Sequence, residues 1–140
     1  MADSPEISII IPAYNEYHRL PPTLLDIINY FERNQRQYQV IVVDDGSTDQ
    51  TSELVEKFTQ VRSQVKLLRI LRNQGKGNAV REGVLASSAP RILFADADGS
   101  TPIQEVERLE MALNQGADIA SGSRALPSHD TTVKTYWYRK

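Results

Sequence analysis

Two carboxylates spaced two residues apart are a strong candidate for metal chemistry in this sequence. Asp96 and Asp98 follow residues 92–95, an apolar run typical of a buried strand. In an extended chain alternate side chains point to the same face, so both carboxylates would share one face. Hard oxygen ligands of this kind suit Mg²⁺ or Mn²⁺, with substrate phosphates completing the coordination shell. The alternative is an ordinary turn at the end of a strand, where Asp and Gly are common.

A second acidic pair, Asp44 and Asp45, follows the apolar run of residues 40–43. Adjacent residues of an extended chain point in different directions, so one carboxylate can face a pocket while the other ties down the loop. A carboxylate at this place can accept hydrogen bonds from ribose hydroxyls or from a uracil N–H. Turn chemistry leading into a helix is the alternative for the same pair.

Residues 12–16, Pro-Ala-Tyr-Asn-Glu, place an aromatic ring beside a carboxylate directly after another apolar run. The ring of Tyr14 offers a face on which a nucleotide base can stack. The carboxylate of Glu16 can accept hydrogen bonds from a base or a ribose. The alternative for Tyr14 is an aromatic residue at the edge of the core, but the pair together favours a nucleoside contact.

Three cations are candidates for contacts with phosphate. Lys76 lies in residues 73–77, Asn-Gln-Gly-Lys-Gly, which resemble a phosphate cradle because glycines permit close approach of the backbone. This segment is neither a dinucleotide fingerprint nor a P-loop, since Val80 stands where the third glycine would be and no Ser or Thr follows the lysine. Arg124 and Arg139 can bind phosphate oxygens in a bidentate way. The alternatives are a solvated loop lysine and ordinary surface arginines.

Short apolar runs alternate with segments of helical spacing along the chain. The runs predict strands at residues 7–11, 40–43, 65–70 and 92–95, and residues 117–121 are a candidate fifth strand. Apolar residues at three- and four-residue spacing predict a helix after each of the first four strands. The first helix is expected to start near Pro21, the second to begin with a capping box of Ser47 and Gln50, and the third to stop before Pro90. The fourth is expected to have its N-terminal cap at Thr101 and to end at Gly116.

Strands separated by helices must pair in parallel, with right-handed crossovers. The sequence therefore predicts an open, mostly parallel, Rossmann-like α/β sheet with helices on both faces, in a single domain over residues 1–140. Sheets of this type bind ligands beyond the carboxyl ends of their strands. The candidate residues follow those ends, as do five of the seven glycines, namely Gly46, Gly75, Gly77, Gly99 and Gly122.

Composition excludes several classes of protein. The chain has 140 residues, a net charge of −2 and a hydrophobic fraction of 40%, which is ordinary for a globular domain and argues against a dedicated nucleic-acid binder. The absence of cysteine excludes disulfides and thiolate metal sites, and fits a reducing compartment. No stretch approaches the roughly 18–20 apolar residues of a transmembrane helix, and the first residues do not resemble a signal peptide.

Taken together, the loop motifs resemble the nucleotide-sugar domain of inverting glycosyltransferases of family 2, which have the GT-A fold. Within the family, three segments are most similar to the dolichyl-phosphate β-glucosyltransferase branch, namely residues 19–21, 75–77 and 96–102. The polyprenyl-phosphate mannosyltransferases are the next most similar branch. The matching segments occur in family order at residues 9–16, 41–49, 73–80, 93–102 and 121–124.

The resemblance implies a reaction and a role for each matching residue. The expected reaction transfers a hexose from a UDP-sugar to a polyprenyl or dolichyl phosphate, and the branch that the sequence resembles implies that the hexose is glucose. The reaction would use Mg²⁺ or Mn²⁺ and take place at the cytosolic face of a membrane. The metal ligands would be Asp98 and Asp96, with Ser100 a weaker ligand, and the catalytic residues would be Asp96, Asp98, Arg124 and Arg139. The nucleotide-sugar contacts would be Pro12, Ala13, Tyr14, Glu16, Asp44, Asp45, Lys76, Asp96 and Ala97.

Length is the departure from the family pattern, since members of the family extend well past residue 140. The chain is therefore interpreted as the N-terminal catalytic part, truncated on the acceptor side. The alternatives are another family 2 transferase with a glycan acceptor, and a nucleotide-binding fragment without turnover. Haloacid-dehalogenase phosphatases and phospho-receiver domains also carry acidic pairs, but theirs follow the first strand, whereas these follow the second and the fourth.

Overall fold

The structure of the protein is a computed structural model, and it describes residues 4–122. The chain divides into two compact units, residues 1–104 and residues 105–140. The first unit contains a four-stranded sheet and three α-helices, and the second contains one described α-helix.

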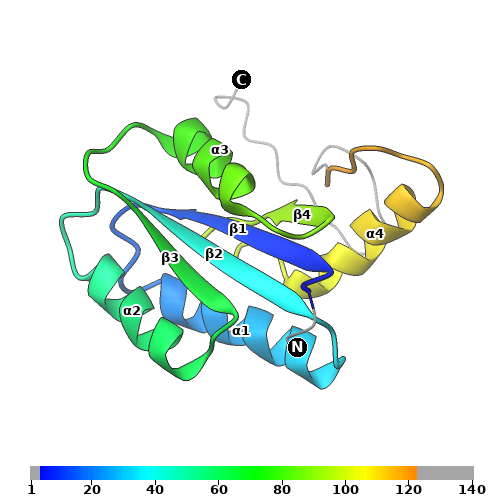
Figure 1. Ribbon diagram of the computed structural model, residues 1–140, viewed down its shortest axis with the longest axis horizontal. Coiled ribbons are helices and arrows are strands. Elements are labelled where there is room, and N and C mark those ends of the chain that lie inside the picture. The colour runs from blue at the N-terminus through cyan, green and yellow to red at the C-terminus, as the bar shows by residue number, and fades with distance from the viewer. Residues whose placement is uncertain (1–3, 123–140) are drawn as a thin grey trace, which may run out of the picture. The chain divides into compact units, whose positions relative to one another are not determined.

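The sheet is parallel throughout, with the strand order β3-β2-β1-β4 (Figure 1). Its strands are β1 (Ile7–Ala13), β2 (Tyr38–Asp45), β3 (Val65–Ile70) and β4 (Arg91–Phe94). Every residue of β1 and β2 is buried, as expected for the central strands of a sheet covered on both faces. The predicted open parallel sheet is confirmed.

The two central strands extend further than the apolar runs predict. β1 continues through Pro12 to Ala13, and β2 includes both Asp44 and Asp45. Pro12 fits inside β1 because pairing with β4 ends at Ile10, so the missing N–H removes no hydrogen bond on that side. The acidic pair therefore belongs to a strand, which fixes the opposite directions of its side chains.

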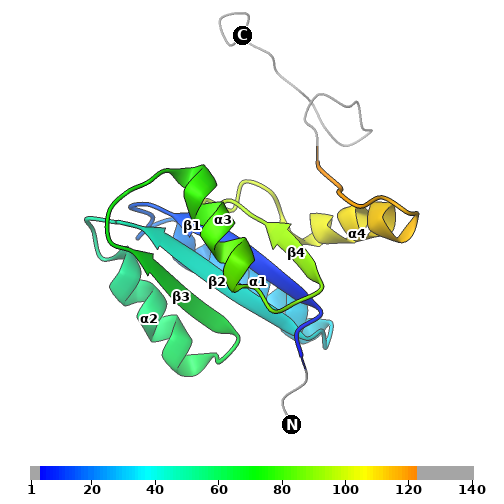
Figure 2. The same cartoon turned by 45° about the horizontal axis from the view of Figure 1, so that its top comes forward.

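Three helices cover the two faces of the sheet, as predicted. They are α1 (Leu20–Arg33), α2 (Thr51–Val61) and α3 (Lys76–Ala86). α1 and α2 lie on one face and α3 lies on the other, as both views show (Figure 1, Figure 2). α1 begins with two prolines in its first turn, where their missing N–H groups cost nothing.

The predicted capping box of α2 is wrong. The helix begins at Thr51, one residue after Gln50, and its N-terminus has no capping-box hydrogen bond. The hydroxyl oxygen of Ser47 accepts the backbone N–H of Asn15 instead, at 2.9 Å. A carboxylate oxygen of Asp49 accepts the N–H of Thr51 at 2.9 Å, so Asp49 closes the turn that leads into the helix.

In the second unit, α4 (Val106–Asn114) begins later than the sequence predicts. Thr101 is not its cap, because a 3₁₀ turn at Ile103–Glu105 precedes the α-helix. The expected end at Gly116 is confirmed: this residue has φ +106°, which glycine adopts without strain. The N–H groups of Gly116 and Ala117 donate to carbonyls of the last helical turn, which forms a Schellman motif.

The candidate fifth strand is also wrong. Residues 117–121 form no strand, and within residues 4–122 the sheet has four strands. This segment consists mainly of small and polar residues, and its one large apolar side chain, Ile119, is 88% exposed. Without an apolar face to bury, the segment gains little from joining a sheet.

Close packing of α3 against the sheet depends on Gly83. A Cβ atom there would overlap Ile10 Cγ2 and lie 3.0 Å from Val43 Cγ2. We expect Gly83→Ala to destabilise the fold by roughly 1–3 kcal/mol, because overpacking outweighs the gain of up to about 1 kcal/mol in helix propensity. Urea unfolding followed by circular dichroism measures the change.

Gly77→Ala is the matched control, since Gly77 is in the same helix and a Cβ there meets nothing within 4 Å. This variant should be as stable as the original chain or more stable, by up to about 1 kcal/mol. Equal free energies of unfolding for the two variants would contradict the packing argument.

Tyr38 makes stability sensitive to alkaline pH. Its ring stacks on Phe31, and its hydroxyl donates to Glu32 Oε1 at 3.3 Å. Burial, and then the charge of Glu32, raises the pKa of Tyr38 to about 12. An unfolded tyrosine loses its proton near pH 10, so the unfolded state is favoured as the pH rises from about 10 to about 12.

Between about pH 8 and about pH 11, Tyr38→Phe should therefore lose less unfolding free energy than the original chain. An equal loss in the two proteins would contradict this prediction.

Candidate functional site

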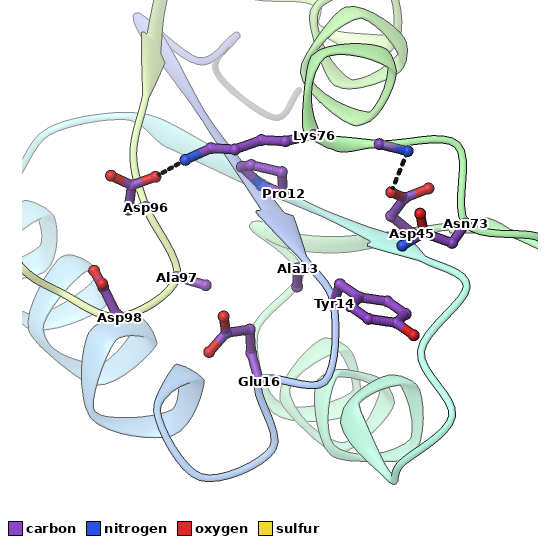
Figure 3. A pocket seen from close by; sticks show the side chains of 11 residues that line it. Pro12, Ala13, Tyr14, Glu16, Asp45, Asn73, Lys76, Asp96, Ala97 and Asp98 are labelled. Carbon is purple, nitrogen blue, oxygen red and sulfur yellow. Dashed lines mark hydrogen bonds and ion pairs between the residues drawn. The ribbon is translucent and has the colours of Figure 1, made fainter. Parts of the chain in front are cut away.

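A cavity of about 400 Å³ opens at the carboxyl ends of β1, β2 and β4 (Figure 3). It lies wholly within the first unit. Its walls come from the ends of those three strands and from the start of α3, which are the places where the sequence predicted a site. The lining residues are Pro12, Ala13, Tyr14, Glu16, Asp45, Asn73, Gly75, Lys76, Asp96, Ala97 and Asp98.

Asp45 connects β2 to the loop that precedes α3. Its side chain is 3% exposed, and its two oxygens accept the backbone N–H groups of Gln74 and Gly75, each at 2.9 Å. The neighbouring Gly46 has φ +73°, and a Cβ there would lie 2.6 Å from the backbone nitrogen of Asn73. The backbones of the two loops are therefore in close contact, and Asp45 fixes the position of one loop relative to the other at the cavity wall.

Asp44 points to the other face of the sheet and does not line the cavity. One of its oxygens accepts the N–H of Ser47 at 3.0 Å, and the other accepts the hydroxyl of Ser52. The structure thus divides the acidic pair between two tasks. Asp45 faces the cavity, whereas Asp44 anchors the start of α2.

Asp96 and Asp98 follow the end of β4 and both line the cavity, but Ala97 and Asp98 lie in a turn and not in the expected extended chain (Figure 3). Asp96 forms an ion pair with Lys76. Asp98 accepts the N–H of Ser100 at 2.9 Å. The backbone and hydroxyl hydrogen bonds from Ser100 hold the pKa of Asp98 below its ordinary value, and the charges of Arg19 and Lys76 act in the same direction. Asp98 is therefore ionised at neutral pH.

The donor set at this end of the cavity fits a divalent cation that arrives with its substrate. Residues 4–122 contain no group of three or more His, Cys, Asp or Glu side chains arranged around a common metal position. Two carboxylates are nevertheless a usual protein contribution to Mg²⁺, when phosphate oxygens of the substrate and water supply the rest. Ser100 does not line the cavity, and its hydrogen bonds go to Asp98.

Lys76 spans the cavity from the α3 side to the β4 side, passing above Pro12 in the close view (Figure 3). Its ammonium group lies 5.1 Å from the ring centroid of Phe94 and pairs with Asp96. Lys76 is the first residue of α3 rather than a loop lysine. It is thus a cation placed where it can contact a phosphate group in the cavity.

Glu16 and Arg19 form a two-pronged ion pair at the rim, with N···O distances of 2.7 and 2.6 Å. The hydrogen bond and charge of Glu16 raise the pKa of Arg19 above its ordinary value. In the close view the Glu16 carboxylate lies on the Asp98 side of the cavity, and the Tyr14 ring lies on the Asp45 side (Figure 3). The cavity thus has an aromatic end and an acidic end.

Most of the predicted nucleotide contacts meet in this one cavity; Asp44 is the exception. Arg124 and Arg139 lie outside the described residues. The sequence motifs assign no contact role to two lining residues, Asn73 and Gly75, although the glycine-containing motif around Lys76 includes both.

Similarity to known proteins identifies the family of this chain. The model of the family described as "Glycosyl transferase family 2" matches residues 8–139. The chain belongs to glycosyltransferase family 2. It is 41% identical to dolichyl-phosphate β-glucosyltransferase of Mus musculus and 39% identical to that of Homo sapiens, over 98% of this chain in both cases. The match covers 47% of each relative, so the chain spans about half their length.

Two solved structures share the fold. S. aureus TarS 1–349 in complex with UDP-GlcNAc superposes with a TM-score of 0.59 and 29% identity, covering 66% of this chain and 26% of that one. A mannosyltransferase of Pyrobaculum calidifontis in complex with GDP-Man and Mn²⁺ gives a TM-score of 0.63 at 24% identity, covering 75% and 31%. Among the described helices, none has the length and apolar character needed to cross a membrane.

Proposed function

We propose that this family 2 chain carries the nucleotide-sugar site of an inverting transferase that moves glucose from UDP-glucose to a polyprenyl or dolichyl phosphate. The observation that carries the proposal is the single cavity in which an aromatic end and an acidic end meet. The relatedness to dolichyl-phosphate β-glucosyltransferases supports the choice of donor sugar and acceptor.

The aromatic end of the cavity is the proposed nucleoside site. Tyr14 offers a ring face to the base, and Pro12 and Ala13 add apolar lining to the same cavity. Asp45 keeps lone pairs beyond the two N–H groups that it already accepts, so it can also accept a uracil N–H. Asp44 does not line the cavity and acts here as the anchor of α2.

The acidic end is the proposed diphosphate site. Asp98 and Asp96 would hold Mg²⁺ or Mn²⁺, and the bound cation would stabilise the charge that develops on the departing UDP. Lys76 supplies a positive charge at the same end, and Asp96 and Ala97 are the proposed contacts to the ribose and the diphosphate. Arg124 and Arg139 are the proposed further contacts to the diphosphate.

The acceptor chemistry is compatible with the absence of a strong base among these residues. A phosphate monoester is already ionised near neutral pH, so it can attack the sugar carbon without losing a proton to the protein. A lipid phosphate acceptor also places the reaction at a membrane surface, which we propose to be its cytosolic face.

Calorimetric titration of the chain with UDP, UDP-glucose and GDP, with and without Mn²⁺, tests the proposed site. Binding that requires the cation, with UDP bound more tightly than GDP, is the expected result. No binding of either nucleotide would contradict the proposal. Transfer of radiolabelled glucose to polyprenyl phosphate in detergent then separates turnover from binding of the nucleotide alone.

A further inference from the structure

Asn15 has an unusual backbone conformation at the mouth of the cavity. Its φ is +53°, in the left-handed region, which Asn tolerates better than most residues with a side chain. It lies between Tyr14 and Glu16, both of which line the cavity, but it does not line the cavity itself. The conformation of Asn15 therefore determines the directions in which its two neighbours leave the backbone.

The side chain of Asn15 collects donors from the loop that follows β2. Its Oδ1 atom accepts the backbone N–H groups of Thr48 and Asp49, at 2.8 and 3.2 Å, and the hydroxyl of Thr48 at 3.3 Å. The N–H of Asn15 donates in return to Ser47 Oγ, at 2.9 Å. We call these four residues, Asn15, Ser47, Thr48 and Asp49, the clasp.

Two further hydrogen bonds join the same two segments on the C-terminal side of Asn15. The N–H of Glu16 donates to Thr51 Oγ1 at 3.0 Å, and the N–H of Tyr17 donates to Asp49 Oδ2 at 3.4 Å. Three consecutive N–H groups of one loop are thus satisfied by side chains of the other loop and of the first residue of α2. Such a run of bonds fixes the path of residues 15–17 relative to β2 and α2.

Tyr14 depends on this path for its position. Tyr14 is 46% exposed, so the core covers only part of it, and the direction of the adjacent backbone strongly influences where the ring lies. The ring lies at the Asp45 end of the cavity, and the Glu16 carboxylate lies at the other end (Figure 3). The left-handed turn at Asn15 is what sends these neighbours to opposite ends.

From this geometry we infer that Asn15 is a positioning residue for nucleotide binding, which acts by presenting the ring of Tyr14 to the base. The inference rests on the proposed function, because it takes the aromatic end of the cavity as the nucleoside site. Asn15 contributes two separable properties, a tolerated left-handed backbone and a side-chain acceptor for the second loop.

Three substitutions separate these properties. Asn15→Gly keeps the left-handed backbone and removes the acceptor, and Asn15→Asp keeps both. Gln35→Gly is the matched control, because Gln35 has φ +52°, is exposed and lies outside the cavity.

Calorimetry with UDP and Mn²⁺ should show about tenfold weaker binding for Asn15→Gly, which is the size of a disturbed stacking contact. The affinity of Gln35→Gly for UDP should be unchanged. Asn15→Asp should stay within about threefold of the original chain, since exposed charges are screened.

A double-mutant cycle with Tyr14→Ala gives the readout that a purely structural role would not move. Once the ring is absent, Asn15→Gly should weaken UDP binding by less than about twofold. An equal loss with and without the ring would overturn the inference, and so would an Asn15→Gly variant that binds UDP as tightly as the original chain.

If Asn15→Gly fails to fold by circular dichroism, Asn15→Asp decides the question. A folded Asn15→Asp variant that loses as much affinity as Tyr14→Ala would overturn the role of the acceptor, and near-original affinity supports it. Failure of the original chain to bind UDP contradicts the proposed function and the inference together, whereas the outcomes of the cycle bear on the inference alone.

Discussion

Asp98→Asn is expected to abolish most of the cation-dependent binding of UDP, with a loss of at least about tenfold in affinity, because each lost charged contact is worth about 1.4 kcal/mol or more. The substitution removes the charge that would hold the cation and leaves an amide oxygen that can still accept the N–H of Ser100. The fold should therefore be retained, so the effect reports on the site. Titration of UDP in the presence and absence of Mn²⁺ measures it.

Asp26→Asn is the matched control for this substitution. Asp26 lies on the exposed side of α1, outside the cavity, and its replacement changes the net charge by the same amount. Its affinity for UDP should equal that of the original chain within about twofold, since exposed charges at a distance are screened. If both variants lost affinity to the same extent, a general electrostatic effect would replace the proposed cation site.

Asp45→Asn is expected to impair both stability and nucleotide binding. The carboxylate is buried and accepts two backbone N–H groups, whereas an amide offers one acceptor and directs its NH₂ group at the other donor. A buried donor without an acceptor costs about 1–3 kcal/mol. The loop before α3, which carries Gly75 and Lys76, would lose its anchor, and UDP affinity should fall by about tenfold or more.

The neighbouring Asp44→Asn gives a contrast in stability. Ser52 meets Asp44 through a hydroxyl, which can turn from donor to acceptor and satisfy the new NH₂ group. Urea unfolding should therefore show a smaller loss for Asp44→Asn than for Asp45→Asn. The reverse order would show that the two carboxylates have been assigned to the wrong anchoring roles.

The sequence by itself determined the architecture and the edge of the sheet where the site lies. Four β-branched or apolar runs separated by helical spacing leave few alternatives to a parallel sheet, because a buried strand and an amphipathic helix have different periods. Parallel strands point in one direction, so motifs that follow them in sequence must meet at one edge. The meeting of Tyr14, Asp45 and Asp98 in one cavity follows from that rule.

Limits of elements were less predictable, because local signals compete with long-range contacts. Ser47 and Gln50 have the spacing of a capping box, but Ser47 bonds to Asn15 from a distant part of the chain. Residues 117–121 are a candidate strand by sequence, yet they form none and lack an apolar face. In both cases a local pattern was compatible with the predicted element, and tertiary contacts or burial decided against it.

Only the tertiary structure decided which side chains hold the loops and which remain available to a ligand. Asp44 and Asp45 are the same residue type in adjacent positions, and the packing of α2 and α3 on opposite faces gives them different partners. The clasp around Asn15 joins residues more than thirty positions apart in sequence, so no local pattern could reveal it. The physical reason is that sequence periodicity specifies the burial of apolar faces, whereas hydrogen bonds between loops depend on distances that exist only after the sheet has formed.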